Sequence, residues 1–510
     1  MGIEGVCRLL DRGPGKLVQL ELNLQPYMMF TAGAGNNAVW RDVLTNTDVP
    51  SQIKFNNYGF SGGYDFSLFP DRDFRKKHAK MPGERVVVIT GGSVVHGVGA
   101  TANDKTIAGQ LEAVLNARQS KYKYRVVNLG MGSWIAYQQF IGLSLFATPL
   151  DPDWVVVMDG YNDAASPCAQ GTGPGNPMGW PKMLYLTGGG KGVELRSALM
   201  QWLIRNSAAA RVVTGMQPSQ QNGQFDRLYF DNEDPDKRFT IKMRGLKMAD
   251  LDKQIDFYLL AQENVMNLFS SAKIIYSTQP QMFDNAVAPN YRKAYTLEAT
   301  RESVEAAKGR LNAELDGYMA RASETKCDSR AGSAVVGYFM ARSALRMEQA
   351  AAEWSKRFEN RTILYFNAEM AFPYEPRLRR PQFIDSAHMS DFGQRHVAEY
   401  FAGFILEKDL GVPFDPAAQA AAVRAETLDL MGTSAADSSV TTQIVKYDYS
   451  APPAELPGTS VSANPVMEGV TAKERSSGAL QLNELDDYGY HRVIWSGVPA
   501  TSGRRNTVTI

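Results

Sequence analysis

The sequence predicts an α/β fold in which helices cover both faces of a parallel sheet. Three short runs rich in β-branched residues lie at 85–90, 124–128 and 154–159, and helical stretches at 106–117 and 134–146 separate them. Each run is almost continuously apolar, which is typical of strands that are buried on both faces of a parallel sheet. The alternation of strand and helix is the pattern of the crossover units that build such a sheet.

The sequence after residue 160 predicts further strands and two insertions. Strands are expected at 273–278 and 362–366, and a last helix of this region at 392–406. The insertions occupy about 165–270 and 295–360, and apolar residues at helical spacing predict that they contain helices. These helices would either pack on the sheet and on each other or cover the substrate as a cap.

The length of 510 residues suggests two or three domains, because a single hydrophobic core usually stops growing at about 250–300 residues. We expect an N-terminal extension at 1–80 that packs on the following domain, an α/β domain at 81–410 that contains both insertions, a helix and linker at 411–465, and a partial β-rich accessory segment at 466–510. The linker is rich in Pro and small polar residues, which bury too little apolar surface to order themselves.

The accessory segment contains strand-like runs at 479–482, 490–495 and 507–510, separated by Gly, Asn, Asp and Ser. Because the chain stops within strand-like sequence, we expect only the first half of a small β domain to be present. The start of the chain could be trimmed as well.

The composition is that of an ordinary folded protein, with 44% hydrophobic and 21% charged residues. Lys plus Arg and Asp plus Glu both total 54, so there is no basic excess that would favour nucleic acid or an anionic membrane as a partner. No apolar run is long enough to span a membrane, and the first residues lack the features of a secretory signal. We therefore expect a cytoplasmic protein from the chain as written, or an exported or periplasmic one if an upstream leader or anchor is missing.

The three cysteines are Cys7, Cys168 and Cys327. An odd number at wide spacings fits neither a disulfide framework nor a metal cluster, so we expect free thiols. The histidines are scattered as well, and no His-Glu-x-x-His occurs, so the sequence indicates no metal site and no cofactor.

A candidate nucleophile follows the first strand. Gly91 and Gly92 lead into Ser93 directly after the run at 85–90, which places a hydroxyl at the carboxyl end of a parallel strand. Open α/β sheets bind their ligands at that edge, and glycines there allow a tight turn and a close approach of substrate. On this pattern alone, a turn serine or a helix cap is the simpler interpretation.

Two further segments supply partners for Ser93. Asp385 precedes His388 by three residues, just ahead of the last helix. A carboxylate at this spacing can orient the imidazole, fix its tautomer and stabilise the imidazolium. Asn162 follows the third strand, so its amide reaches the same sheet edge and can donate to an oxyanion without carrying charge. The simpler role for Asn162 is to stabilise a turn.

The other four histidines have simpler interpretations. His78 lies in a charged stretch that predicts a solvated surface, and His491 lies in the C-terminal β-rich segment. His96 is interpreted as a turn residue that could line the pocket, and His396 as a packed or solvated residue of the last helix.

Together these segments resemble the SGNH (GDSL-like) hydrolases, whose signature is spread over blocks that carry Ser, Gly, Asn and Asp-x-x-His. ITGGSVVHGVG is similar to the family's GDS block, with Gly92 in place of its Asp, and VVNLGMGSWIAYQQ is similar to the VVNxGxxG block, with Ser133 in place of the signature Gly. VVVMDGYND matches the GxND pattern at Asn162, and FIDSAHMSDFGQRHVAEYFAGFIL matches the terminal block. The resemblance covers roughly residues 50–407, interrupted by the insertions.

The resemblance implies a flavodoxin-like three-layer α/β/α sandwich that cleaves carboxylic esters through an acyl-enzyme intermediate. Ser93 would attack the ester carbonyl, His388 would serve as general base and then as general acid, and Asp385 would orient it. The N–H groups of Ser93 and Ser133, with the amide of Asn162, would form the oxyanion hole. The family uses the backbone N–H at the Ser133 position, and serine supplies one too.

The substrate is expected to be a small-molecule or glycan ester. We favour O-acetyl or other short acyl groups on a carbohydrate, because the accessory β-rich segment resembles the start of a glycan-binding sandwich and zero net charge suits a neutral polymer. The alternatives are a lipolytic esterase or lipase, an O-acyltransferase, and, in another class, a catalytically weak carbohydrate-binding protein on a hydrolase fold. The sequence leaves the oligomeric state open.

Two rival motifs fail. Residues 97–102 loosely fit G-x-G-x-x-A, but the match begins seven residues past the strand, and the second strand ends without the acidic residue that would bind a ribose. The α/β-hydrolase motif G-x-S-x-G fails because Val95 occupies its last glycine position.

Overall fold

The structure of the protein is a computed structural model. It describes residues 47–62, 76–164, 247–282, 287–295, 301–325 and 332–431, the shorter stretches 22–25, 28–32, 39–42, 460–462, 479–484 and 491–496, and the single residues Phe66, Gly175, Asn285 and Cys327.

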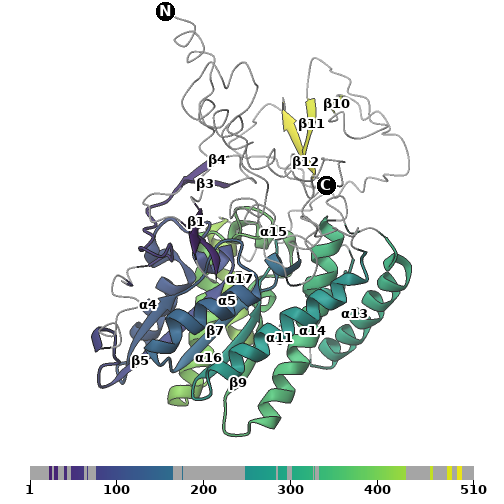
Figure 1. Ribbon diagram of the computed structural model, residues 1–510. Coiled ribbons are helices and arrows are strands. Elements are labelled where there is room, and N and C mark those ends of the chain that lie inside the picture. The colour runs from purple at the N-terminus through teal and green to yellow at the C-terminus, as the bar shows by residue number, and fades with distance from the viewer. Residues whose placement is uncertain are drawn as a thin grey trace, which may run out of the picture.

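Five parallel strands form the central sheet (Figure 1). They are β5 (Glu84–Gly91), β6 (Lys123–Asn128), β7 (Trp154–Asp159), β8 (Lys273–Thr278) and β9 (Ile363–Asn367), and their order is β6-β5-β7-β8-β9. This is the flavodoxin-like order, in which the second strand lies outside the first and the chain then runs to the opposite edge. The predicted α/β fold is confirmed, and every predicted bound of these five strands lies within one residue of the observed bound.

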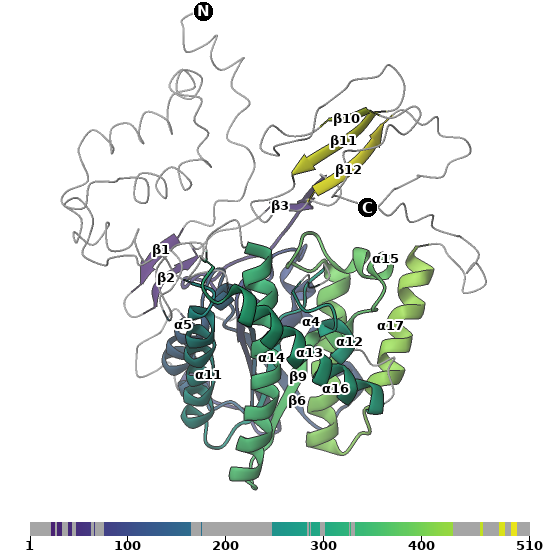
Figure 2. The ribbon, with the colours of Figure 1, turned by 90° about the vertical axis from the view of Figure 1, so that its right-hand side faces the viewer.

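Helices cover both faces of the sheet. Alternate side chains of each strand point to opposite faces, so that Val86 and Val88 enter one hydrophobic cluster while Val87 and Ile89 enter the other. The first cluster is covered by α5 (Ala136–Gly142), α11 (Asp250–Leu268) and α14 (Gly332–Arg357), and the second by α4 (Ile107–Arg118) and α16 (Asp391–Leu410). Figure 2 shows α11 and α16 on opposite sides of the molecule. Burial on both faces explains why these strands are almost continuously apolar.

The predicted second insertion forms two long helices. They are α13 (Arg301–Ala322) and α14, and α12 (Tyr291–Tyr295) precedes them. Leu311 and Leu315 of α13 and Phe339 of α14 belong to the same hydrophobic cluster as Ile274 of β8. The described helices of this insertion therefore pack on the same face of the sheet as α11.

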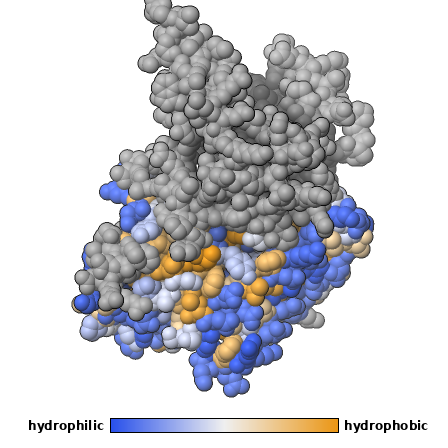
Figure 3. Space-filling model, viewed as in Figure 1, coloured by the Kyte–Doolittle hydropathy of each residue, from blue (hydrophilic) through white to orange (hydrophobic). Residues whose placement is uncertain are grey.

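Gly175 and residues 247–270 are the described part of the predicted first insertion. The Gly175 N–H donates to Gln254 Oε1 of α11 at 2.6 Å, and a β carbon on Gly175 would lie 3.1 Å from the Phe257 ring. Figure 3 shows apolar residues gathered on one face of the molecule. Phe257 and Leu260 of α11 are 42% and 46% exposed. Gly175 therefore lies against α11 beside an apolar part of the surface.

The end of the N-terminal extension contacts the loops that follow β5 and β6. Ser51 Oγ donates to the Ala100 carbonyl at 2.8 Å, and Asn128 Nδ2 donates to Ser61 Oγ at 2.9 Å. Upstream, β1 (Leu22–Gln25) pairs with β2 (Met29–Ala32), and β3 (Val39–Asp42) pairs with β4 (Thr47–Pro50), both antiparallel. The contacts of residues 51–61 place this segment beside the carboxyl edge of the sheet.

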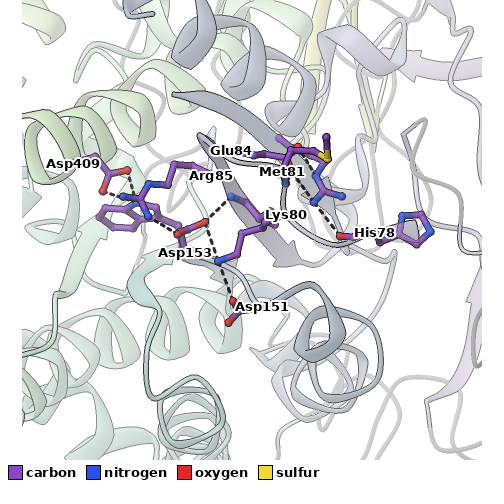
Figure 4. A network of polar contacts seen from close by, with 11 residues as sticks. His78, Lys80, Met81, Glu84, Arg85, Asp151, Asp153 and Asp409 are labelled. Atoms are coloured by element: carbon purple, nitrogen blue, oxygen red, sulfur yellow. Dashed lines mark hydrogen bonds and ion pairs between the residues drawn. The ribbon is translucent and has the colours of Figure 1, made fainter. Parts of the chain in front are cut away.

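Charged side chains join the elements at the opposite edge, where the strands begin (Figure 4). Asp153 accepts from Arg85 Nη1 at 2.7 Å and from the Val86 N–H at 2.8 Å, and it lies 3.5 Å from Lys80 Nζ. Asp409, at the end of α16, pairs with Lys273 at the start of β8. This network ties strands and a helix together at the edge that lies away from Ser93.

The chain continues after α16 into one more helix and a small sheet. α17 (Pro416–Leu430) matches the helix expected in the 411–465 segment, and β10 (Ser460–Ser462), β11 (Ala479–Glu484) and β12 (His491–Ser496) form a three-stranded sheet. β11 and β12 confirm two of the three expected strand-like runs, and the run at 507–510 lies outside the described residues. No helix of the described part is both long and apolar enough to span a membrane.

Two predictions about single residues are wrong. Cys327 is disulfide-bonded rather than a free thiol, and the two other cysteines, Cys7 and Cys168, lie outside the described residues. His78 was expected on a solvated surface but is only 7% exposed. The charged residues around His78 predict that its side chain is exposed. Its burial depends on the tertiary fold, which places residue 78 beside the start of β6.

Candidate active site

The chain turns sharply from β5 into a short helix that begins with Ser93. β5 ends at Gly91, and α3 (Ser93–His96) follows after Gly92. A β carbon on Gly92 would come within 2.6 Å of Asn162 Nδ2, so glycine lets the Asn162 amide lie directly against this turn. As the first residue of α3, Ser93 has a backbone N–H without a partner inside the helix.

Ser93, His388 and Asp385 form a chain of two hydrogen bonds at the carboxyl edge of the sheet. Ser93 Oγ lies 2.7 Å from His388 Nε2, and His388 Nδ1 lies 2.6 Å from Asp385 Oδ2. Asp385 accepts a hydrogen bond from the Nδ1–H group, so Nε2 of the neutral ring carries no hydrogen and can accept from the serine hydroxyl. The His388 and Asp385 side chains are 25% and 23% exposed, so the base can be reached from outside.

The loop that carries Asp385 and His388 is held by local hydrogen bonds. Asp385 Oδ1 accepts from the Ala387 N–H at 2.8 Å and from the His388 N–H at 2.6 Å. The Ile384 N–H donates to the His388 carbonyl at 2.9 Å, which closes the loop just before Ser390 caps α16. One carboxylate therefore fixes both the backbone and the ring of His388, which is the physical reason for the three-residue spacing.

The two ionisable groups of this chain shift each other's pKa. Burial raises the pKa of Asp385, but the charge and hydrogen bonds of His388 outweigh this effect and hold the pKa below its ordinary value. Burial lowers the pKa of His388, whereas the charge of Asp385 and its hydrogen bond raise it, and the resulting pKa lies above the ordinary value. The pair thus favours the imidazolium that forms when His388 takes a proton.

Ser133 and Asn162 lie on the loops that follow β6 and β7. Asn162 Nδ2 donates one hydrogen to the Trp134 carbonyl at 2.9 Å, which leaves its second hydrogen for another acceptor. The Met131 N–H donates to the Gly91 carbonyl at 3.0 Å, so the loop that carries Ser133 lies beside the turn that carries Ser93. Ser133 has a φ of 65°, which lies in the left-handed region that favours glycine.

Comparisons with known proteins gave matches among solved structures alone. No protein-family model matches the chain, and no curated protein matches it. Among solved structures, a lipase/acylhydrolase from Enterococcus faecalis is 11% identical, with a TM-score of 0.29 over 64% of this chain and 96% of that one. A putative acylhydrolase from Bacteroides fragilis is also 11% identical, with a TM-score of 0.29 over 68% and 100% of the two chains. An acetyl xylan esterase from Geobacillus stearothermophilus is 12% identical, with a TM-score of 0.28 over 65% and 96%.

The chain resembles the SGNH hydrolases. Its strand order is the flavodoxin-like one. The five predicted site residues, which come from four separate blocks of the sequence, lie on the loops at the carboxyl edge of the sheet. Metal-binding groups of three or more His, Cys, Asp or Glu do not occur in the described part of the chain.

Asp163 is a residue of the SGNH-like site that the sequence did not single out. Its carboxylate accepts from the Ala136 N–H, at 3.2 Å from Oδ1 and 3.1 Å from Oδ2. It therefore ties the turn that carries Asn162 to the first residue of α5, directly after the Ser133 loop. The only sequence signal for this residue is its place next to Asn162 in the same block. The hydrogen bond itself joins residues that are 27 positions apart, so no local pattern predicts it.

Two other histidines, His96 and His396, are buried and bonded to groups other than Ser93. His96 is 1% exposed, bonds the Gly59 carbonyl through Nε2 at 2.8 Å, and stacks on Phe55. Burial lowers the pKa of His96 to about 4, so it stays neutral and fixes α3 to the N-terminal extension. His396 is buried in α16, and its Nδ1 lies 3.0 Å from Gln382 Oε1. Neither histidine is bonded to Ser93.

Proposed function

We propose that the protein is a serine hydrolase that cleaves carboxylic esters, with Ser93, His388 and Asp385 as its triad. The observation that carries this proposal is the pair of hydrogen bonds, 2.7 Å from Ser93 Oγ to His388 Nε2 and 2.6 Å from His388 Nδ1 to Asp385 Oδ2. A hydroxyl, an imidazole and a carboxylate joined in this order form the arrangement that activates a serine for acyl transfer.

The reaction has two halves. Ser93 Oγ forms a bond to the ester carbonyl carbon while His388 Nε2 takes the hydroxyl proton, and His388 then gives that proton to the departing alcohol as the ester C–O bond breaks. A water molecule next attacks the acyl-enzyme, again with His388 as base, and the proton returns to Ser93 as the acid leaves. Asp385 keeps the ring in the tautomer that both halves need.

The oxyanion of each tetrahedral intermediate is stabilised by donors from three loops. We assign this role to the backbone N–H groups of Ser93 and Ser133 and to the second hydrogen of Asn162 Nδ2. The left-handed backbone of Ser133 and the bond from Asn162 to the Trp134 carbonyl orient two of these donors. Losing one such donor typically lowers turnover by about 10²–10³-fold.

The central test is Ser93→Ala. We expect this variant to lose release of 4-nitrophenol from 4-nitrophenyl acetate, because no other described hydroxyl is bonded to His388. Circular dichroism of the variant controls for folding, and a phosphonofluoridate probe should add to Ser93 in the wild type, as read by mass spectrometry of the peptide. Near-wild-type turnover by Ser93→Ala would remove the assignment. An unlabelled, inactive wild type would instead favour the binding protein on a hydrolase fold.

For the substrate, we propose O-acetyl or other short acyl groups on a carbohydrate. The net charge of zero suits a neutral polymer, and a small β-sheet follows the hydrolase region, as in proteins that add a glycan-binding module. Acetate release from acetylated xylan should exceed that of a Ser93→Ala control. Faster cleavage of long-chain 4-nitrophenyl esters would favour a lipolytic enzyme, and transfer of the acyl group to an added sugar would favour an O-acyltransferase.

A further inference from the structure

A buried ion pair that takes no part in the proposed triad lies beside the loop of the proposed base. Arg379, at the end of α15 (Pro376–Arg379), donates from Nη2 to Glu369 Oε2 at 2.7 Å, and the two side chains are 0% and 2% exposed. Arg292 of α12 is buried as well, and its Nε lies 3.6 Å from the same oxygen. Because the loss of hydration offsets much of the attraction within a buried ion pair, such a pair is weak evidence for a purely stabilising role.

The ion pair holds residues 279–282, which follow β8 and are called the β8 loop here. Glu369 Oε1 accepts from the Gln281 N–H at 2.8 Å, and Arg379 Nη2 donates to the Gln281 carbonyl. Arg292 Nη2 donates to the same carbonyl at 3.4 Å. Hydrogen bonds to charged groups are about twice as strong as bonds between neutral groups. The backbone of the β8 loop is therefore fixed by charged partners on both its N–H and its carbonyl side.

The β8 loop bonds in turn to the loop of the proposed base. The Met282 N–H donates to the Ser386 carbonyl at 3.0 Å, and Gln279 Nε2 donates to the Ala387 carbonyl at 3.3 Å. Ser386 and Ala387 are the two residues between the carboxylate and the imidazole of the proposed triad. A continuous set of hydrogen bonds thus runs from the buried ion pair to the backbone that carries these two groups.

We infer that Glu369 and Arg379 are positioning residues of His388. The ion pair fixes the β8 loop, and the β8 loop fixes the two carbonyls between the carboxylate and the imidazole. The Arg379 guanidinium also lies 5.4 Å from the ring centre of Phe383, which precedes Asp385 by two residues. A displacement of reacting groups by about 1 Å can lower turnover by about 10²-fold. The inference rests on the proposed function, since it takes His388 as the base.

The first test is Arg379→Met in the full chain. Methionine removes the guanidinium, while Arg292 stays beside Glu369, so the carboxylate keeps a cation. We expect kcat for 4-nitrophenyl acetate to fall by about 10–100-fold while KM stays nearly constant, because the base is misplaced and the binding of substrate is not changed. Because the hydrogen bond and charge of Asp385 raise the pKa of His388, a looser bond should also move the midpoint of the pH–rate profile to lower pH.

Lys273→Met is the matched control. Lys273 lies at the other end of β8 and pairs with the buried Asp409, so this variant also removes a cation from a buried carboxylate. Asp409 keeps its bonds from the Tyr124 hydroxyl and from Trp154 Nε1. The control should keep kcat and the midpoint even where its stability falls. An equal loss of kcat in Lys273→Met, or a wild-type kcat and midpoint in Arg379→Met, would overturn the inference.

The second test breaks the last contact without removing a charge. Gln279→Met keeps the side-chain volume and removes the amide that bonds the Ala387 carbonyl. It should lower kcat and move the midpoint in the same direction as Arg379→Met, but by less, because the bond from the Met282 N–H to the Ser386 carbonyl stays. A variant with unchanged kcat and midpoint would contradict the route through the β8 loop and the inference with it.

Circular dichroism and thermal unfolding of each variant show whether the comparison is made between folded proteins. Should Arg379→Met fail to fold, the double variant Glu369→Gln/Arg379→Met takes its place, because it removes one charge of each sign and keeps an oxygen for the Gln281 N–H. The same loss of kcat and the same shift of the midpoint are expected, and their absence would overturn the inference.

The wild type separates the two proposals. A wild type that neither hydrolyses the ester nor reacts with a phosphonofluoridate at Ser93 contradicts the proposed function, and the positioning role of Glu369 and Arg379 with it. An active, labelled wild type whose Arg379→Met and Gln279→Met variants keep their kcat and midpoint overturns the positioning role alone.

Discussion

Ser133 holds a backbone conformation that suits glycine. Its φ of 65° brings the β carbon close to the following carbonyl, which costs about 1–2 kcal/mol relative to glycine. The resemblance to the SGNH blocks places a glycine at this position, and the structure supplies the physical reason. Strain of this kind persists where surrounding contacts hold the residue in place, here the hydrogen bonds of the neighbouring Trp134.

We therefore predict that Ser133→Gly stabilises the protein and keeps its turnover. The free energy of unfolding should rise by up to ~1 kcal/mol, because the relief of strain exceeds the added unfolded-state entropy of glycine of about 0.4–1 kcal/mol. The backbone N–H stays in place, so 4-nitrophenyl acetate should be cleaved as by the wild type. Denaturant unfolding measures the first effect. Ser133→Ala, which keeps the β carbon, is the control, and equal stability of the two variants would contradict the strain.

The pair of His388 and Asp385 predicts the pH dependence of the reaction. His388 must be neutral to act as base, and its pKa is raised by Asp385, so kcat/KM should rise with pH through a midpoint above the ordinary histidine value of about 6.5. Asp385→Asn removes the charge that raises this pKa and leaves the burial that lowers it. Its midpoint should move below ~6.5, and its turnover at neutral pH should fall by about 10⁴-fold. A pH–rate profile of both proteins tests this, and an unchanged midpoint would exclude His388 as the titrating base.

At the scale of elements, the site depends on a contact between the loop after β7 and the start of α5. The Ala136 N–H donates to both carboxylate oxygens of Asp163, so a side chain from the β7 loop caps a helix that follows β6. Helices of this length need such partners, because their first N–H groups have none inside the helix. The cap also sets where the Ser133 loop ends and α5 begins.

Asp163→Ala should therefore affect stability and turnover together. Loss of the cap should lower the free energy of unfolding by about 0.5–2 kcal/mol and should lower kcat as the Ser133 loop shifts. Asp415→Ala is the control, because Asp415 caps α17 by accepting from the Ala417 and Ala418 N–H groups. It should lose similar stability with an unchanged kcat. Equal kcat in the two variants would show that the Asp163 cap is structural only.

Elements were predicted well from sequence where their pattern is local. The strands of the sheet are apolar runs bounded by glycine or turns, so the sequence indicates where each strand begins and ends. The predicted helix at 134–146 is divided in the structure into α5 and the π-helical turn Leu143–Ala147, with the Ser133 loop before them. That loop bends away because its backbone bonds to Gly91 and its carbonyl to Asn162, which are contacts between segments that no local pattern encodes.

At the scale of the whole molecule, the disulfide of Cys327 bears on the compartment. Disulfides form and persist in oxidising environments and are rare in the reducing cytosol. We therefore propose the exported or periplasmic location rather than the cytoplasmic one.

The same disulfide predicts a dependence of stability on reductant. Loss of the bond, by reduction or by Cys327→Ser, should lower the free energy of unfolding by about 2–4 kcal/mol. Denaturant unfolding with and without a phosphine reductant measures this effect, and mass spectrometry of unreduced peptides identifies the partner as Cys7 or Cys168. Replacing the remaining cysteine with serine is the control and should leave stability unchanged. Three titratable thiols in the unreduced, unfolded protein would contradict the bond.

The sequence by itself determined the parallel α/β sheet and the three-residue pairing of Asp385 with His388. Both follow from short-range patterns, since an apolar run determines a buried strand and a carboxylate three residues away can reach an imidazole. Only the tertiary structure decided that Ser93 meets His388 across 295 residues, that Asp163 caps α5 at Ala136, and that His78 is buried. These contacts depend on the order of strands and the packing of helices over them, and residues far apart in sequence carry no local signal of their distance in space.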